Sequence, residues 1–426
     1  MTALNLISLL GVVVLAAIAW AAGGFRRPFP ARTVLGAGCL MVVLAAGLFW
    51  LPPARVALLA VNDVVLAVLG AGQAGARFLF GPLALNPGET GPGGEVSVGF
   101  VLAAQVLPAV IFFASLMGML YHLRVMEPVV RLFAKVFRGT MRLSGAEALS
   151  GAANIFVGVE SAMTVRPYLE RMTRSELLTL VSCGMATVAS TTLAIYVSFL
   201  RDSFPLIAGH LVSASVLAIP AAVLVSKLLL PEEGIPETLG AVPPLDPGSR
   251  HANAFAALTA GAWDGLRLAA GIATLLIAVL GVVALVDLAL GKAPGDLNLA
   301  RLLGWVFAPL AWLLGLDAKD VLPAASLLGQ RAILTEVVAY GELAKLAAAG
   351  TITPRTVLVM SYALCGFAHV ASVGIFVGGT AALCPSRRDD LAGLGPKALI
   401  AATLATLMTG ALAGVFYHGQ TGLIAP

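Results

Sequence analysis

The chain has 426 residues, of which 59% are hydrophobic and 11% are charged, and its mean hydropathy is +0.96. Soluble domains carry roughly 25% charged residues, so this composition excludes a soluble globular protein and predicts an all-α polytopic protein of the lipid bilayer. The net charge of +4 is modest, and no basic tract with interleaved aromatics occurs, so no nucleic-acid partner is expected.

Charge-free apolar runs locate the predicted membrane spans. Each run is long enough for a helix of about 20 residues, which crosses a hydrocarbon core of about 30 Å. Eight such runs lie at 1–25, 33–53, 96–123, 177–200, 203–226, 268–286, 356–386 and 398–426. No basic segment precedes the first run, so we expect a retained helix there instead of a signal peptide.

An even number of spans places both termini on one side of the membrane. Lys and Arg gather in alternate connections, among them 26–32, 124–142 and 387–397. Because basic loops stay on the cytoplasmic side, we expect both termini to lie outside.

Three segments between the spans are expected not to cross. Residues 55–84 are apolar but interrupted by Asp63 and Arg77, which indicates one or two interfacial helices. Residues 127–138 place apolar residues on one helix face and basic residues on the other, which predicts an amphipathic helix that binds anionic lipid on the cytoplasmic surface. Residues 231–248 carry five prolines and four acids, which is typical of a solvated linker.

Two further segments, about 143–170 and about 320–348, are too short to cross twice and too polar for ordinary spans. Each has an acid near its middle, Glu160 and Glu336, and each precedes a span with small and polar residues at its centre. An ionisable residue in a membrane costs at least about 2.5–3.5 kcal/mol and marks a substrate or ion path. The order of hairpin, broken helix and helix, repeated in inverted orientation, predicts a transporter with a midplane site.

The polar residues of these segments have alternative explanations. The two acids are either satisfied within their hairpins or serve as ligand acceptors or protonation sites. The hydroxyls between Thr187 and Thr192 either bond back to helix carbonyls or line an unwound segment that binds a hard cation. His369 either packs in the core or contacts a ligand. An intramembrane hydrolase is a weak alternative, since the sequence holds no H-E-x-x-H, G-x-S-x-G or P-loop motif.

At these residues the chain resembles the concentrative nucleoside transporter family. The resemblance covers nearly the whole chain and is strongest from about Gly99 onward. The matching stretches are Val106–Phe113, Leu143–Gly158, Val165–Leu169, Leu327–Gln330, Glu336–Tyr340 and Tyr362–Ala368.

This resemblance implies eight transmembrane helices with two re-entrant hairpins in inverted repeats, interfacial helices and a homotrimer in the bacterial inner membrane. It also implies import of nucleosides, coupled to sodium or in some members to protons, by an elevator-like movement. No other cofactor is expected. The expected divisions are scaffold helices with an interfacial segment at 1–98, a scaffold helix with the amphipathic helix at 99–142, the first repeat at 143–230, a linker with a scaffold helix at 231–319, and the second repeat at 320–426.

The resemblance also implies site residues by position. The implied sodium ligands are Asn154, the Val157 carbonyl, Thr187 and the Val188 carbonyl. The implied substrate contacts are Glu336, His369 and Ser372 for the ribose, with Glu160, Thr192 and Phe367 for the base.

The chain departs from the family pattern at both hairpins. The family's Gly-Gln-Thr-Glu tip is here Gly158-Val159-Glu160, one residue shorter, and an ungapped alignment would put Ser161 at the position of the Glu. The family's Asn-Glu-Phe is Thr335-Glu336-Val337, and its Asn after the second break is His369. Because buried polar contacts select ligands, the substrate is a nucleoside, a modified nucleoside or another sugar-like solute, and His369 could add proton coupling. A membrane protein that binds a ligand without moving it is a further alternative.

Overall fold

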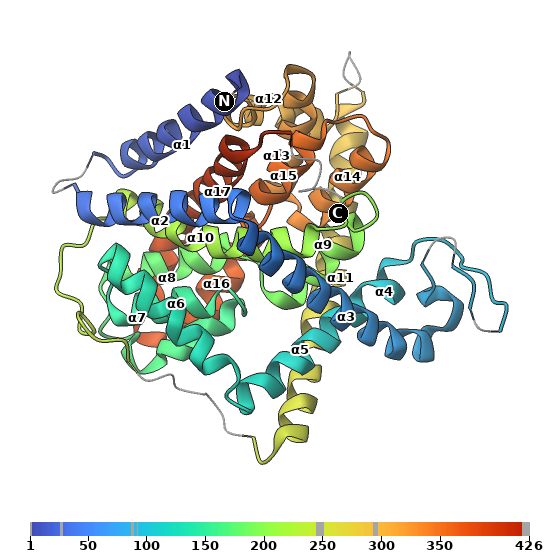
Figure 1. Cartoon of the computed structure of the whole chain (residues 1–426), viewed down its shortest axis with the longest axis horizontal. Helices are drawn as coiled ribbons and strands as arrows, with labels where there is room; N and C mark the ends of the chain where they lie inside the picture. The colour runs from blue at the N-terminus through green and yellow to red at the C-terminus, as the bar shows by residue number, and fades with distance from the viewer. Residues whose placement is uncertain are drawn as a thin grey trace.

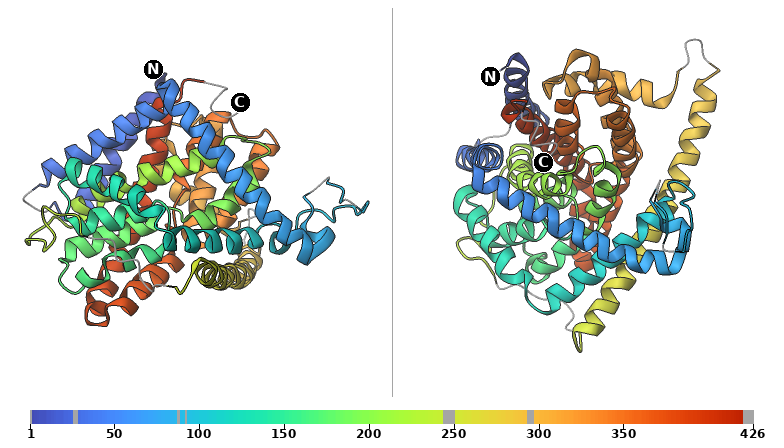
Figure 2. Two further views of the ribbon diagram at one scale, coloured as in Figure 1. Left: turned by 60° about the horizontal axis from the view of Figure 1, so that its bottom comes forward. Right: turned by 45° about the vertical axis from the view of Figure 1, so that its right-hand side comes forward.

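Helices form nearly all of the regular structure in the computed structural model, which describes residues 2–25, 29–86, 89–91, 93–243, 251–292 and 297–419. Among these residues the extended pairing is an isolated bridge between Thr90 and Val96. The helices pack into one body from which α11 stands out along one side (Figures 1 and 2). The predicted all-helical fold is therefore confirmed.

Seven helical stretches are long and apolar enough to cross a membrane, counted over the described residues. Six coincide with predicted spans. These six fall on α1 (Ala3–Ala22), α2 (Ala31–Trp50), α4 and α5 (Leu102–Gln105 and Leu107–His122), α10 (Ile207–Leu229), α11 (Ala254–Leu290) and α17 (Arg388–Phe416).

The seventh stretch is α3 (Pro52–Phe80), followed by the short 3-10 helix η1 (Gly81–Ala84). The sequence indicated one or two interfacial helices here, and the structure shows one helix running diagonally from α2 toward α4 and α5 (Figure 1). Arg77 lies in the last turn of this helix, and its guanidinium lies 2.7 Å from the carboxylate of Glu89, beyond the helix end. The charge of Arg77 therefore has a partner and does not interrupt the helix.

The two remaining predicted spans are broken helices. Span 177–200 divides into α8 (Arg174–Ala186) and α9 (Ser190–Leu200), and span 356–386 divides into α15 (Pro354–Ala363) and α16 (Val370–Leu383). The two breaks touch one another. Gly366 has φ +156, and a Cβ there would lie 2.7 Å from the Ala186 carbonyl oxygen, so this close approach requires glycine.

The two predicted hairpins are helix–turn–helix units. The first joins α7 (Gly145–Ala153) to the 3-10 helix η2 (Val159–Tyr168), and the second joins α13 (Val321–Ile333) to α14 (Glu336–Ala348). A capping box of Ser144 and Glu147 starts α7. Whether either unit re-enters a membrane stays a prediction.

The amphipathic helix is α6 (Met126–Met141), with α12 (Leu299–Leu313) and the short helices η3 (Ala318–Asp320) and η4 (Pro385–Arg387) completing the fold. The buried face of α6 packs on α7 and α2. Helices α5 and α11 cross closely, because a Cβ on Gly261 would lie 2.5 Å from the Ala114 carbonyl oxygen.

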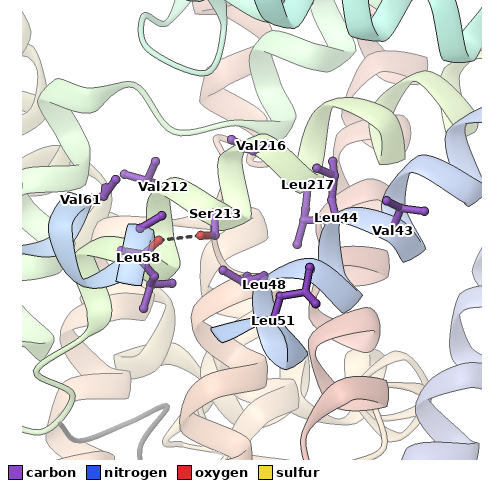
Figure 3. A pocket seen from close by; sticks show the side chains of 13 residues that line it. Val43, Leu44, Leu48, Leu51, Leu58, Val61, Val212, Ser213, Val216 and Leu217 are labelled. Atoms are coloured by element: carbon purple, nitrogen blue, oxygen red, sulfur yellow. Dashed lines mark hydrogen bonds between the residues drawn. The ribbon is translucent and has the colours of Figure 1, made fainter. Parts of the chain in front are cut away.

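An apolar groove of about 450 Å³ lies between α2, α3 and α10 (Figure 3). Its lining includes Leu48, Leu58 and Val212, and its one hydroxyl, on Ser213, donates to the Gly209 carbonyl oxygen at 2.9 Å. A polar solute needs open donors and acceptors. This groove therefore does not have the character of the solute site.

Candidate functional site

The two helix breaks carry the same short motif. Cys183–Ser190 reads CGMATVAS and Cys365–Ser372 reads CGFAHVAS, identical at six of eight positions. Thr187 in the first motif thus corresponds to His369 in the second. The breaks also pack on each other, and both of these side chains are buried.

Glu336 is the centre of the second repeat's polar cluster. It is 2% exposed at the first position of α14. Its Oε1 accepts the Tyr196 hydroxyl at 2.8 Å, and Nε2 of His369 lies 3.1 Å from Oε2. The carboxylate is therefore held by Tyr196 on one oxygen and faces His369 with the other, which can accept one further hydrogen bond.

His369 caps the N-terminus of α16. Its Nδ1 accepts the Ser372 backbone N–H at 3.3 Å, so in the neutral ring the proton sits on Nε2, facing Glu336. An Asn side-chain oxygen makes the same cap bond at this kind of position. Imidazole can therefore replace the family's Asn without loss of the cap.

The other predicted substrate contacts already have partners within the protein. The Ser372 hydroxyl donates to the His369 carbonyl oxygen at 2.6 Å and also contacts the Phe367 carbonyl. The Phe367 ring lies 6.0 Å from that of Phe376, and the Thr192 hydroxyl donates to the Ala189 carbonyl at 3.1 Å. Of the predicted ribose contacts, Glu336 keeps the most acceptor capacity, since each carboxylate oxygen can accept more than one hydrogen bond.

Asn154 is the centre of the first repeat's polar cluster and is fully buried at the end of α7. Its Nδ2 donates to the Ser150 carbonyl oxygen at 3.1 Å, which fixes the amide orientation. Its Oδ1 accepts the Ser161 hydroxyl at 2.8 Å. Ser161 therefore points toward the predicted cation site.

The first break reaches the same cluster from α8. Gly184 lies beside Asn154 and against the Phe376 ring, since a Cβ there would lie 3.4 Å from Oδ1 of Asn154 and 2.5 Å from Cε1 of Phe376. The Thr187 hydroxyl donates its proton to the Cys183 carbonyl at 2.9 Å, which leaves its lone pairs free. Back-bonding and cation binding, which the sequence presented as alternatives, are therefore compatible.

The two predicted carbonyl ligands lie in backbone that leaves the helix. Val157 follows α7 in the turn of the first hairpin, and Val188 lies between α8 and α9. Neutral amide, hydroxyl and carbonyl oxygens are a donor set that suits a hard cation. The residues present fit sodium.

A cavity of about 200 Å³ meets the first hairpin beside this cluster. Val157, Gly158 and Ala189 line one side, and Gly261 and Asp264 of α11 are on the other. The predicted base contact Glu160 lies in η2, but its side chain is outside the described part of the structure.

Three residues of the site escaped sequence reasoning. Tyr196 follows the predicted contact Thr192 by four residues, a spacing that places both on one helix face and could have identified it. Arg331 of α13 is fully buried, and its Nη1 donates to the Ala363 carbonyl at 2.6 Å and to the Thr406 hydroxyl at 2.7 Å. It ties the second hairpin to the end of α15 and to α17. Thr335 gave no signal beyond its place beside Glu336.

Comparisons with known proteins agree with this architecture. Three family profiles match consecutive parts of the chain: "Na+ dependent nucleoside transporter N-terminus" over residues 10–83, "Nucleoside recognition" over 103–203, and "Na+ dependent nucleoside transporter C-terminus" over 210–414. An uncharacterized transporter of Haemophilus influenzae is 37% identical, covering 96% of this chain and 97% of its own. The nucleoside permease NupC of Helicobacter pylori is 34% identical, covering 97% and 98%.

The chain belongs to the concentrative nucleoside transporter family. Among solved structures, the transporter CNTnw in an inward-facing substrate-bound state superposes with a TM-score of 0.87 at 37% identity, covering 97% of this chain and 98% of that one. Membership of this family makes the chain a multi-pass membrane protein built for nucleoside transport. Its named relatives are permeases and transporters, which move solutes and do not convert them.

Proposed function

We propose that the chain is a secondary active symporter that imports nucleosides or nucleoside-like solutes with sodium. The observation that supports this most is the pair of touching helix breaks, each beside one buried polar cluster. One cluster presents neutral oxygens around Asn154, and the other presents the buried Glu336 carboxylate between Tyr196 and His369. Two sites in one small volume allow each ligand to stabilise the other's binding conformation.

The cation would bind Asn154, the Val157 and Val188 carbonyls, and Thr187. The substrate hydroxyls would bind Glu336, beside His369 and Ser372, with the base near Thr192, Phe367 and Glu160. The bond from the Ser161 hydroxyl to Asn154 supports our proposal of Glu160, in place of Ser161, for the base position. Sodium as the coupling ion agrees with the Na+-dependent family descriptions. A proton on the Glu336–His369 pair is the alternative coupling ion.

Alternating access would proceed by elevator movement of the two hairpin-bearing repeats against the α5–α11 pair. Cavities flank both hairpins on the side of α11, of about 200 Å³ at the first and about 730 Å³ at the second. The protein would act as a homotrimer in the bacterial inner membrane with both termini outside.

Uptake into proteoliposomes tests this function. With an inward sodium gradient we expect radiolabelled uridine or adenosine to accumulate, and Glu336→Gln to abolish accumulation while the protein still inserts. Glu342→Gln is the matched control, because this acid lies on the same helix in an exposed pair with Lys345 at 3.0 Å. Undiminished uptake by Glu336→Gln would refute the site assignment.

A symporter for a non-nucleoside polar solute is a second candidate, because the family's base-reading Gln is missing from the first hairpin. A thermal-shift panel of nucleosides and sugars, with and without sodium, separates the two, since a ligand of the folded state raises the melting temperature. Gradient-driven accumulation of any of these compounds would exclude a binding protein that does not transport.

A further inference from the structure

The tip of the second hairpin holds a buried hydroxyl without a hydrogen-bond partner, Oγ1 of Thr335, in a residue that is 5% exposed. Oε2 of the following residue, Glu336, is buried as well and faces Nε2 of His369 at 3.1 Å, so this carboxylate oxygen can accept one further hydrogen bond. An unpaired buried polar group costs about 1–3 kcal/mol, so the Thr335 hydroxyl indicates a ligand that completes it.

Thr335 is especially informative because it stands at the N-cap of α14. An N-cap threonine normally accepts a backbone N–H from the first turn. Here φ is −165 and ψ is 165, and the side chain makes no cap bond. The hydroxyl is therefore free both to donate and to accept.

Tyr196 fixes the orientation of the carboxylate between these atoms. Its hydroxyl donates to Oε1 at 2.8 Å. Its ring is stacked on Tyr340 with centroids 4.3 Å apart and planes at 12°, and the Tyr340 hydroxyl donates to the Ser361 carbonyl oxygen at 2.5 Å. Because the Tyr196 ring is held in this way, rotation of the carboxylate would break its bond to Oε1.

We propose that Thr335 and Glu336 together bind a pair of neighbouring hydroxyl groups on the substrate, and that Tyr196 is a positioning residue for this contact. Oε2 accepts one hydroxyl, and Oγ1 of Thr335 exchanges a hydrogen bond with the other. This inference rests on the proposed nucleoside function, where the ribose 2′- and 3′-hydroxyls are such a pair. It adds Thr335 and Tyr196 to the recognition of the sugar.

The proposal is tested by removing the protein hydroxyl and the ligand hydroxyl separately and together, and by comparing the resulting losses of affinity. Purified full-length protein with sodium is titrated with uridine, 2′-deoxyuridine and 3′-deoxyuridine. We expect Thr335→Val to weaken uridine binding about tenfold, because the variant loses one hydrogen bond worth about 1.4 kcal/mol. The same variant should bind one of the two deoxy ligands as the wild type does, because that ligand lacks the partner hydroxyl.

Tyr196→Phe should likewise reduce the affinity for uridine more than the affinity for the deoxyuridine that lacks the hydroxyl bound by Glu336. Tyr362→Phe is its matched control, since this buried hydroxyl bonds the His210 ring and not Glu336. Thr409→Val controls for a lost buried hydroxyl, because the Thr409 hydroxyl bonds the Thr406 carbonyl. Thr335→Ser should restore uridine affinity, which separates the hydroxyl from effects on folding.

Equal losses on all three ligands, or no loss on any, would overturn the inference and leave the proposed function intact. Failure of the wild type to bind any of the three would overturn both. A variant that does not fold is recognised by loss of its melting transition. In that case, titration of Thr335→Ser and of the wild type with uridine and the two deoxyuridines tests the inference.

Discussion

Thr187 and His369 occupy the same position of the repeated motif but make different hydrogen bonds. The Thr187 hydroxyl donates to the Cys183 carbonyl oxygen and keeps its lone pairs, which the proposed cation would use. His369 uses Nδ1 for the cap of α16 and turns Nε2 toward Glu336. At equivalent positions, the hydroxyl at the first break therefore offers a hydrogen-bond acceptor, and the imidazole at the second break offers a donor.

At the residue scale, Thr187→Val should weaken sodium binding while leaving the fold in place. The change removes the lone pairs but keeps the volume and the β-branch. We expect the sodium concentration for half-maximal uptake to rise about tenfold, as for one lost contact to a charged ligand. Sodium titration of uptake measures this.

Thr187→Ser serves as the control, because it keeps the hydroxyl and should keep near-normal sodium dependence. An unchanged sodium dependence in Thr187→Val would show that the hydroxyl does not bind the ion.

Sequence reasoning found the residues that are costly to bury and missed their partners. Glu336 and Asn154 stand out because an acid or amide in an apolar stretch needs a reason. Tyr196 is ordinary in composition, and its importance lies in a bond to Glu336, 140 positions away. Spacing along one helix cannot reveal a bond that forms between two repeats.

At the element scale, a buried ionic cluster joins the starts of α7 and α8 to the end of α10. Nζ of Lys227 lies 2.5 Å from Oε1 of Glu147, donates to the Ser175 hydroxyl at 2.9 Å, and lies 3.5 Å from Glu232. The first hairpin, the first half of the broken helix and the following helix are thereby held together. The helices α7 and α8, which end directly before Asn154 and Thr187 respectively, are then held in a fixed position relative to each other.

Lys227→Met should destabilise the protein by about 3–5 kcal/mol, because it leaves the Glu147 carboxylate buried without its counter-ion. Thermal melting in detergent, with denaturant titration where unfolding is reversible, measures the loss. The double variant Lys227→Met with Glu147→Gln should recover most of it.

Lys345→Met is the matched control, since its pair with Glu342 is exposed and should contribute at most about 1 kcal/mol. A Lys227→Met protein as stable as this control would contradict the structural role of the cluster.

Element types were predictable where composition and geometry agree. The breaks in 177–200 and 356–386 follow from small and polar residues within apolar spans, and both occur. The second limb of the first hairpin is a 3-10 helix containing Pro167, which the acid-centred pattern did not predict. The single helix α3 falls within the prediction of one or two helices for this segment, since the exposed charges Asp63 and Arg77 lie on an unbroken helix.

At the scale of the whole molecule, the proposed movement requires α9 and α14 to slide past the segment before α5. The cavity of about 730 Å³ lies between these parts, lined by Phe100 and Phe199 among others. The two rings are 5.7 Å apart. This contact should change during transport.

Cross-linking Phe100→Cys to Phe199→Cys with a short thiol-bridging reagent should therefore stop uptake, and reductant should restore it. Sodium-dependent ligand stabilisation should survive, because neither residue contacts the polar clusters. The experiment needs Cys39→Ser, since Cys39 is the exposed cysteine.

A bridge between Ser115→Cys and Leu258→Cys is the control, because it joins α5 to α11, where the Ser115 hydroxyl donates to the Leu258 carbonyl oxygen at 2.9 Å. That bridge should leave uptake intact. Continued uptake with the first bridge in place would argue against sliding at this contact.

The repeated motif at the two breaks has a consequence for ancestry. A protein assembled from two identical half-length chains would carry the same side chain at the positions now occupied by Thr187 and His369. Its two clusters would be chemically equal, and neither could be reserved for a cation. Joining the halves in one gene lets the copies mutate separately, and in this chain a difference at one matched position accompanies the proposed division between ion and solute.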